Sequence, residues 1–338
     1  MSENYPIDFV VTWVDGNDPV WQAEKAKYSP NKNADNRNVR FRDWDNMQYW
    51  FRAVEKFAPW VNKIHFVTYG HLPKWLNIDN PKLNIAKHSD FIPQKYLPTF
   101  SSQPIELNLH RINGLAERFV YFNDDMFLLR PVKRELFFAG KDCLPTDFAI
   151  TSTISTTTKE DMMPFIKLNC VTILNGHFDK KEQMKKHFSK WVNLAYGWNA
   201  LRNLIFYGQH RFKGFANNHL AFSFLKSEYE DIWEKEYESL DDTSSHKFRS
   251  KLDLDNWLIR YWQLTRGNFY PIGRYKKGKV YEIYNGVEQN QELFKIIEDQ
   301  AMPMICINDN ENVDFEPMKE RIKQAFDKIL PEKSSFEK

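Results

Sequence analysis

The chain has 338 residues, enough for one large α/β domain with a sizeable buried core. Its 47 Lys and Arg residues nearly balance its 45 Asp and Glu residues, so it lacks the broad basic field that nonspecific nucleic-acid binding needs. Its three cysteines are widely separated and form no CxxC pair, which argues against a disulfide framework or a structural zinc site and favours a reducing cytoplasm.

The sequence shows no sign of export or of a membrane span. Its N-terminus enters a strand-like run at once, without a basic region and a cleavage site, and no window holds 18 uninterrupted apolar residues. We therefore expect a soluble, cytoplasmic chain. Aromatic residues make up 16% of it, and because Trp and Tyr stack on sugar faces and nucleobases, they favour a carbohydrate or nucleotide ligand.

The first half of the chain alternates strand-like and helix-like segments, a pattern typical of a parallel or mixed sheet covered on both faces. Apolar residues at helical spacing predict helices over Asp45 to Phe57 and Gln103 to Ala116. Strands are expected at Ile7 to Val14, Lys63 to Tyr69, Leu83 to Ala86 and Phe119 to Phe122.

The second half begins with a polar, hydroxyl-rich run at Thr151, which predicts a loop or hinge. Strand-like pieces return late, at Val280 to Ile283 and Met304 to Ile307, before a last helix at Met318 to Ile329. We therefore predict an α/β fold, a Rossmann-like mixed sheet flanked by helices, with a core of residues 1–150 and 268–338 and a mainly helical insertion at 151–267. Within the insertion, helical periodicity covers Lys180 to Leu194, Asn199 to Tyr207, Leu220 to Leu225, Glu228 to Leu240 and Asp253 to Leu264.

The strongest local signal is the triplet Asn123-Asp124-Asp125, which directly follows an apolar strand. Ligand sites of open α/β sheets lie at the carboxyl ends of strands. Two adjacent carboxylates at that position are unfavourable without a cation, and Mg²⁺ or Mn²⁺ takes oxygen ligands while bridging phosphates. The triplet predicts a metal site; an acidic turn that caps a helix is the alternative.

The first strand ends in a comparable polar segment, Thr12 to Pro19. Gly16 allows close backbone approach, and Asp15 or Asn17 can accept a hydrogen bond from a base or a ribose. A nucleotide could bind there, although a simple turn explains the same residues.

Three further groups of polar residues could take part in chemistry. Arg40 and Arg42 precede a predicted helix, where paired hydrogen bonds from arginine suit a diphosphate, unless they only form a solvated face. His219 titrates near neutrality and could act as a general base or serve a structural role. Arg249 offers a cation, and the late Asn308-Asp309 pair offers metal-binding or capping oxygens.

Four ordered blocks of the sequence resemble the Stealth family of sugar-phosphate transferases, which includes bacterial capsule and cell-wall polysaccharide enzymes and the lysosomal-enzyme GlcNAc-1-phosphotransferase. The first two are specific in length and order, and the resemblance covers most of the chain outside Lys133 to Arg211. The blocks are Ile7 to Pro19 (IDFVVTWVDGNDP), Arg40 to Arg130, Lys213 to Gly267 and Ile305 to Asn310 (ICINDN).

This resemblance implies a GT-A-like fold and a polysaccharide-building reaction. A hexose 1-phosphate, such as GlcNAc-1-phosphate, GalNAc-1-phosphate or Gal-1-phosphate, would pass from a UDP-sugar to a hydroxyl of a glycan or lipid-linked oligosaccharide acceptor, with release of UMP. The chain would then work in the cytoplasm, with peripheral contact with the inner membrane surface. One alternative is a metal-dependent glycosyltransferase that releases UDP, and another is a non-catalytic carbohydrate- or nucleotide-binding protein.

The resemblance also implies site residues, some of them in the helical insertion. Arg249 and Arg42 would neutralise phosphate charge and His219 would take the acceptor proton, although a carboxylate such as Asp125 could be the base instead. The predicted donor-binding residues are Trp13, Asp15, Gly16, Asn17, Arg40, Arg42 and Asn123. The predicted ligands of Mg²⁺ or Mn²⁺ are Asp124, Asp125, Asn308 and Asp309.

Overall fold

A five-stranded sheet forms the centre of the computed structural model, which describes residues 5–29, 42–156, 158, 161–310 and 312–338. Its order is β3-β2-β1-β4-β8; the first four strands run parallel, and β8 pairs antiparallel with β4. Because β1 and β4 are parallel neighbours, their carboxyl ends lie at the same edge. The strands are β1 (Ile7–Thr12), β2 (Ile64–Thr68), β3 (Leu83–Lys87), β4 (Arg118–Phe122) and β8 (Phe222–Leu225).

Two smaller sheets complete the strands. In the order β10-β11-β5, β11 is parallel to β10 and antiparallel to β5, while β6-β7-β9 forms the third sheet. Since β5 follows β4 after only three residues, the second sheet lies directly beside the carboxyl end of β4. Their bounds are β5 (Met126–Leu128), β6 (Phe138–Ala139), β7 (Leu144–Asp147), β9 (Tyr270–Pro271), β10 (Gly278–Glu282) and β11 (Met304–Asn308).

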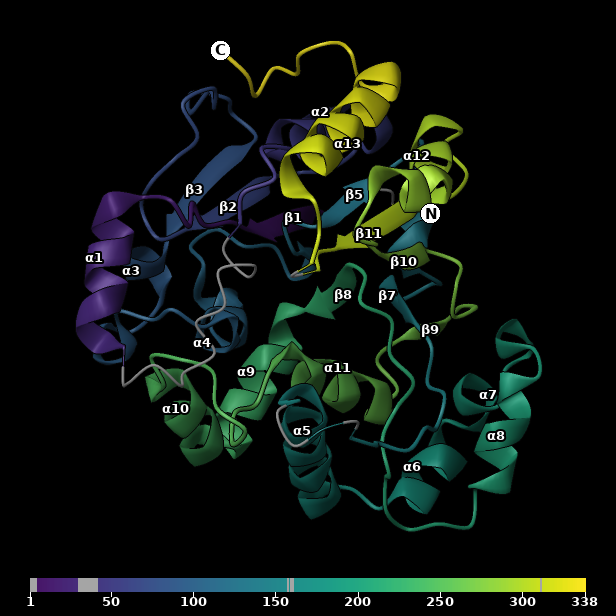
Figure 1. Ribbon diagram of the computed structural model, residues 1–338. Helices are drawn as coiled ribbons and strands as arrows, with labels where there is room; N and C mark the ends of the chain where they lie inside the picture. The colour runs from purple at the N-terminus through teal and green to yellow at the C-terminus, as the bar shows by residue number, and fades with distance from the viewer. Residues whose placement is uncertain (1–4, 30–41, 157, 159–160, 311) are drawn as a thin grey trace.

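Helices cover both faces of the central sheet. Figure 1 shows α2, α12 and α13 above the sheet and α5, α9 and α11 below it. The described helices are α1 (Pro19–Tyr28), α2 (Met47–Phe57), α3 (His88–Phe91), α4 (Ser102–Leu107), α5 (Met163–His177), α6 (Lys180–Lys186), α7 (Phe188–Trp191), α8 (Asn199–Ile205), α9 (Lys226–Lys235), α10 (Tyr237–Ser245), α11 (Asn256–Thr265), α12 (Gln291–Glu298) and α13 (Phe315–Ile329).

The central sheet separates two hydrophobic cores. Side chains alternate across a strand, so Phe9 and Phe122 pack into the core that holds α2 and α13, while Val10 and Phe119 pack into the core that holds α5 and α11. Strands buried on both faces read as continuous apolar runs, which is why β1 and β4 were predictable. The prediction of a mixed α/β fold with flanking helices is confirmed.

One predicted helix is too long, and another is wrong. Residues 103–116 form α4, which ends at Leu107, and a 3₁₀ turn over Leu109–Arg111. The buried Asn108 side chain donates to the Pro104 carbonyl at 2.8 Å, which is the acceptor that the next α-helical bond would use. Residues 220–225 contain strand β8 instead of a helix, because β4 supplies a strand partner. The apolar run is too short for its periodicity to distinguish a helix from a strand.

The predicted helix over 180–194 is broken once and ends at Trp191, and the predicted helix over 228–240 is broken once. His187 separates α6 from α7, and Glu236 separates α9 from α10; both residues leave the helical region, with ψ near 35°. Residues 151–267 therefore contain the helices α5 to α11 and one strand of the central sheet. Within the described residues, no helix is long and apolar enough to cross a membrane.

Candidate active site

A cavity of about 1080 Å³ opens at the carboxyl edge of β1 and β4, and most of the predicted site residues line it. Asp15, Gly16 and Asn17 do not belong to its lining, and Arg40 lies outside the described residues. The lining includes Trp13, Arg42, Asn123, Asp124, Asp125, His219, Arg249, Asn308 and Asp309.

The segment Asp15 to Asn17 forms a simple turn, which is the alternative that the sequence also allows. The Asp15 carboxylate accepts from the Asn17 backbone at 2.8 Å, and the Asp15 backbone N–H donates to His71 at 2.7 Å. Asp18 then caps α1 by accepting from the Trp21 backbone at 2.7 Å. These contacts explain the positions of Asp15 and Asp18, and the role of Asp15, Gly16 and Asn17 in donor binding stays a prediction.

One wall of the cavity consists of carboxylates and amides at strand ends, namely Asn123 to Asp125 after β4 and Asn308 with Asp309 at the end of β11; we call it the carboxylate wall. β5 and β11 pair antiparallel, with Met126 opposite Cys306. The Ile307 backbone N–H donates to the Asp125 carbonyl at 2.8 Å. This pairing brings together two motifs that are about 180 residues apart in the sequence.

The carboxylates of this wall repel one another. Asp124 is exposed on the cavity side, but protein surrounds it elsewhere, so its charge is poorly solvated. Burial, together with the charges of Asp125 and Asp43, raises the pKa of Asp124 to about 7. In addition, Oδ1 of Asp125 is buried without a hydrogen-bond partner among the described residues. Both features are those of a cation site.

The donor set fits a hard divalent ion. Asp124 and Asp125 supply carboxylate oxygens, and Asn308 supplies an amide whose nitrogen already donates to Glu282 at 2.8 Å. Asp309 is less available because it accepts from Trp44 at 3.1 Å and lies 3.7 Å from the Arg42 guanidinium. Asp124, Asp125 and Asn308 are therefore the better ligand candidates.

Cys306 was not predicted as a site residue. Ligand atoms of Asp125, His219 and Cys306 lie within 4.8 Å of one another, a grouping that could suggest zinc. Burial and the neighbouring Asp125 charge, however, hold the pKa of the Cys306 thiol well above its ordinary value. The thiol therefore carries its proton here and donates it in a hydrogen bond to Asp125 Oδ2 at 3.2 Å.

The opposite wall carries His219 on the loop Asn217 to His219, which we call the histidine wall. His219 Nε2 lies 3.6 Å from Asp125 Oδ2 and 3.3 Å from Asn123 Nδ2, so the two walls meet at this residue. Burial lowers the pKa of His219, but the nearby Asp125 carboxylate outweighs burial and leaves the pKa above its ordinary value. The imidazole and a cation held by the carboxylates would thus face the same space.

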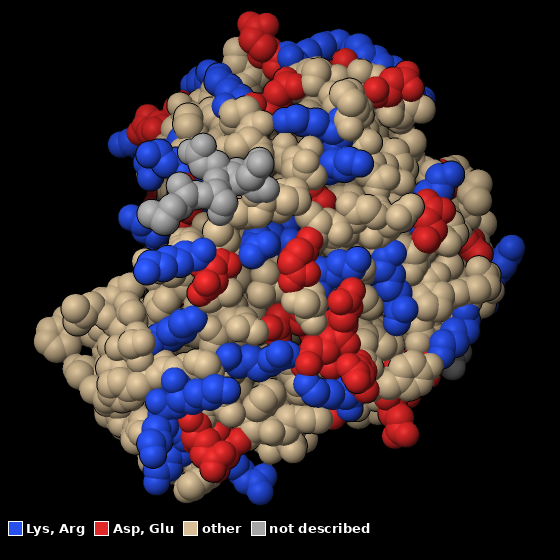
Figure 2. Space-filling view, turned by 180° about the vertical axis from the view of Figure 1, so that it is seen from behind, with Lys and Arg blue, Asp and Glu red and all other residues tan. Residues whose placement is uncertain are grey.

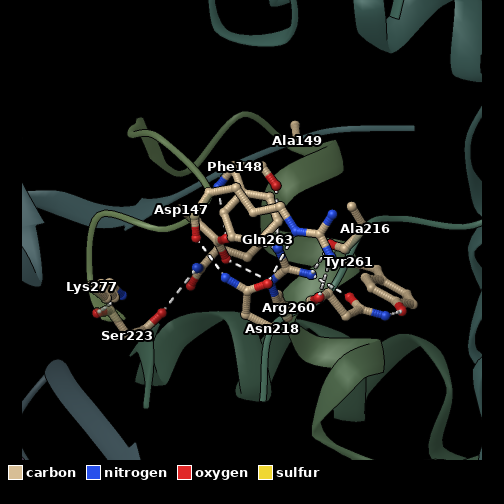
Figure 3. A network of polar contacts seen from close by, with 12 residues as sticks. Asp147, Phe148, Ala149, Ala216, Asn218, Ser223, Arg260, Tyr261, Gln263 and Lys277 are labelled. Atoms are coloured by element: carbon tan, nitrogen blue, oxygen red, sulfur yellow. Dashed lines mark hydrogen bonds and ion pairs between the residues drawn. The ribbon is translucent and has the colours of Figure 1, made fainter. Parts of the chain in front are cut away.

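A buried ion pair holds the histidine wall in place (Figure 3). Arg260, which is 1% exposed, donates from Nε and Nη2 to both carboxylate oxygens of Asp147, at 2.8 and 2.7 Å. Its remaining nitrogen, Nη1, donates to Asn217 Oδ1 at 2.6 Å and to the Ala216 carbonyl at 3.3 Å. Asn217 also donates to Tyr261 at 2.7 Å, so both ends of its amide are fixed two residues before His219.

Arginines lie at two other places on the cavity. Arg42 packs its guanidinium over Phe315, and its Nη1 is buried without a hydrogen-bond partner among the described residues. Arg249 contacts Ser102 Oγ at 3.3 Å. An anion in the cavity would therefore meet guanidinium groups from two separate segments.

Two buried acids of the cavity were also not predicted. Glu106 accepts from the Tyr121 hydroxyl at 3.3 Å, and burial raises its pKa. Burial and then the Glu106 charge raise the pKa of Asp255, which caps α11, to about 7. The sequence around Asp255 predicts only the start of a helix. The structure shows that this N-terminal end of α11 lies at the cavity.

Comparisons with known proteins match this chain along its full length. Two family models match, Stealth protein CR1, conserved region 1, over residues 5–33, and Stealth protein CR2, conserved region 2, over residues 40–144. The chain is 43% identical to the capsular polysaccharide phosphotransferase WcwK of Streptococcus pneumoniae, over 100% of both chains. The chain belongs to the Stealth family. The predicted family is confirmed.

Other relatives have related names. The receptor polysaccharide phosphotransferase WefC of Streptococcus gordonii is 41% identical over 98% of both chains. The exopolysaccharide phosphotransferase cps2G of Lactiplantibacillus plantarum is 38% identical over 100% of this chain and 98% of its own. Among solved structures, the galactosyltransferase LgtC in complex with donor and acceptor sugar analogs matches with a TM-score of 0.37 and 8% identity, over 94% of this chain and 95% of that chain.

Proposed function

We propose that this chain transfers a hexose 1-phosphate, such as GlcNAc-1-phosphate, GalNAc-1-phosphate or Gal-1-phosphate, from a UDP-sugar to a hydroxyl of a glycan acceptor and releases UMP. The observation that carries the proposal is the cavity in which adjacent carboxylates, arginines and a histidine face one another. The names of the relatives, all polysaccharide phosphotransferases, support phosphoryl transfer. The acceptor is a glycan or a lipid-linked oligosaccharide of polysaccharide biosynthesis, met in the cytoplasm.

A divalent cation, Mg²⁺ or Mn²⁺, is the cofactor of this proposal. Asp124 and Asp125 would hold it with Asn308, and Asp309 would contribute through its pairing with Arg42. The ion would neutralise the charge of the diphosphate. The raised pKa of Asp124 and the unpartnered Asp125 oxygen support this assignment.

The reaction breaks one phosphorus–oxygen bond and forms another. The acceptor oxygen attacks the phosphorus next to the sugar, and the oxygen bridging to the uridine phosphate leaves with UMP. The anomeric bond stays intact, so the configuration of the sugar is retained. Because charge builds on phosphoryl oxygens, catalysis consists mainly of positioning and electrostatic stabilisation.

Each wall then has its own task. His219 accepts the proton of the acceptor hydroxyl, and Asp125 stabilises the imidazolium that results, since the two groups are 3.6 Å apart. Arg42 and Arg249 neutralise phosphoryl charge, and Trp13 with Asn123 contacts the nucleotide part of the donor at the β1 and β4 ends. In this assignment Asp125 serves as ligand and partner of His219 rather than as the base.

The second candidate is a metal-dependent glycosyltransferase, in which the acceptor attacks the anomeric carbon. Both reactions use an acidic metal site, so the nucleotide product distinguishes them. We expect incubation with a panel of UDP-sugars and a glycan acceptor to yield UMP together with a phosphodiester-linked product. UDP as the sole nucleotide product would overturn the proposal, and donor binding without any turnover would favour a non-catalytic binding protein.

A further inference from the structure

One end of the molecule presents apolar side chains to solvent. Leu194, Trp198 and Ile205 are 97%, 87% and 77% exposed. Single exposed apolar residues are ordinary, but a group of them marks an interaction site. We call this group the α7–α8 surface, and its members are Phe188, Leu194, Trp198, Leu201, Leu204 and Ile205.

The opposite side of α8 and of the turn before it is bonded to the rest of the protein, which keeps the apolar side chains facing outward. Asn203 of α8 is fully buried, and its amide oxygen accepts from the Thr151 backbone at 2.8 Å. Its amide nitrogen donates to the Ala149 and Trp191 carbonyls at 2.5 Å each. Tyr196 is buried as well, and its hydroxyl donates to the Lys190 carbonyl at 2.7 Å. The exposure is therefore a property of a fixed surface.

Positive charge lies beside the α7–α8 surface. Residues 180–213 contain eight Lys and Arg residues and one Glu, whereas the whole chain has a formal net charge of only +2. Figure 2 shows an uncharged protrusion at the left, where α7 and α8 lie when Figure 1 is turned, with Lys and Arg side chains gathered beside and below it. The exposed cations of this segment are Lys181, Lys185, Lys186, Arg202, Arg211 and Lys213.

We propose that the α7–α8 surface docks the chain on an anionic lipid membrane. Apolar side chains that include an exposed Trp, bordered by Lys and Arg, match an interface of acyl chains below negatively charged headgroups. A second copy of the chain is a poorer occupant, because pairing this face with itself would bring two strongly positive segments together. The surface would bind lipid peripherally, through its apolar and cationic side chains.

The α7–α8 surface is connected to the active site by packing. Phe148, Ile150 and Ala216 form a small core with Tyr196, and the Ala216 backbone donates to the Ile150 carbonyl at 2.8 Å. Ala216 lies three residues before His219. This step rests on the proposed function. If the acceptor is carried on a lipid, the membrane lies on the side of the cavity formed by the histidine wall.

Vesicle sedimentation tests the docking surface. We expect the purified chain to bind vesicles that contain phosphatidylglycerol and to bind pure phosphatidylcholine vesicles at least about tenfold more weakly. The double variant Trp198→Ser/Ile205→Ser should lose about tenfold or more of this binding, since it removes two large apolar groups from the contact. Lys185→Glu/Lys186→Glu should weaken binding by a similar factor and reduce its dependence on salt.

Two matched controls change exposed apolar residues elsewhere. Leu252 and Val20 are 72% and 71% exposed and lie outside the α7–α8 surface, so Leu252→Ser and Val20→Ser should keep wild-type binding. Absence of vesicle binding, or equal loss in controls and test variants, would overturn the proposal. So would a dimer in light scattering that only Trp198→Ser/Ile205→Ser converts to a monomer. Binding is measured without donor or acceptor, so its outcome is separate from that of the UMP experiment.

Discussion

The two walls of the cavity are built in different ways. The carboxylate wall consists of residues that directly follow strands, and neighbouring backbone hydrogen bonds place them. The histidine wall is a loop without regular structure, and a buried side-chain pair, Arg260 with Asp147, places it. One wall therefore depends on the sheet, and the other depends on side-chain contacts, those of the Arg260–Asp147 pair and those of Arg274 with Asn217 and Asn218.

Because of this difference, substitutions in the two walls should have different effects on activity and on stability. On the carboxylate wall, the residues that would hold a cation are themselves fixed by the strands, so a substitution there should remove function and leave the fold. On the histidine wall, Arg260 lies away from the reacting atoms and contacts Asn217, so a substitution should weaken the fold and disturb His219 together.

The largest effect is expected at Asp125. In Asp125→Ala, a predicted metal ligand and the carboxylate beside His219 are both lost, so we expect kcat/KM for UMP release to fall by roughly 10³-fold or more. The thermal unfolding midpoint should stay within a few degrees of wild type, because the change relieves carboxylate repulsion. Glu332→Ala, at an exposed carboxylate outside the cavity lining, is the control. Activity of Asp125→Ala within tenfold of wild type would remove Asp125 from the centre of the site.

The next effect is expected at the buried pair. Arg260→Met leaves the Asp147 carboxylate buried without its partner, which should lower the free energy of unfolding by about 3–5 kcal/mol in urea titrations. Asp147→Asn/Arg260→Met should recover part of this loss, since no unpaired charge remains. Arg211→Met, at an exposed arginine, should change stability by no more than about 0.5 kcal/mol.

Activity measurements on the folded fraction sharpen this second prediction. If Arg260 positions His219, kcat of Arg260→Met should fall with little change in KM for the donor, and Arg260→Lys should restore only part of it because lysine cannot form the paired contact. A destabilised variant with wild-type kcat would show that the ion pair supports the fold alone.

The same contrast explains how much of the site could be predicted from the sequence. Asn123 to Asp125 and Asn308 with Asp309 each adjoin an apolar strand, so local pattern and family resemblance both pointed to them. The long-range pairing that brings the two motifs together, β5 against β11, leaves no local trace. For the same reason Cys306, inside a strand that reads only as core, was missed.

The histidine wall was less predictable. His219 was proposed as a base, but Asp147 and Arg260 were not considered, because a lone acid in a short strand and a lone arginine in an apolar helix carry no signal of their pairing. The sequence even predicts a helix for the adjacent strand β8. Its strand structure depends on pairing with β4, which the local sequence does not show. The turn Asp15 to Asn17 shows the converse: the Asp15 carboxylate accepts from the Asn17 backbone, and the turn lies outside the cavity lining.

The smallest effect is expected at Asp8, a buried acid at the far end of β1 that supports the sheet below the carboxylate wall. Burial raises the pKa of Asp8, but hydrogen bonds outweigh burial and leave the pKa below its ordinary value of 3.8. The bonds come from His65 at 3.0 Å, Asn62 at 2.7 Å and the Ala116 backbone at 2.8 Å. Asp8→Asn should cost about 1–3 kcal/mol at neutral pH, less than Arg260→Met, because it leaves no buried charge unpaired.

The pH dependence of that cost follows from the direction of the pKa shift. A depressed carboxyl pKa adds stability that is fully present above about pH 3.8 and is lost as the pH falls through the lower pKa of the folded state. The stability difference between wild type and Asp8→Asn should therefore be constant between about pH 5 and pH 8 and shrink below pH 4, as measured by urea unfolding at each pH. A difference that stays constant into strong acid would show that lost packing accounts for it. A cost at pH 7 as large as that of Arg260→Met would mean that the sheet also depends on a buried polar anchor, and the contrast between the two walls would fail.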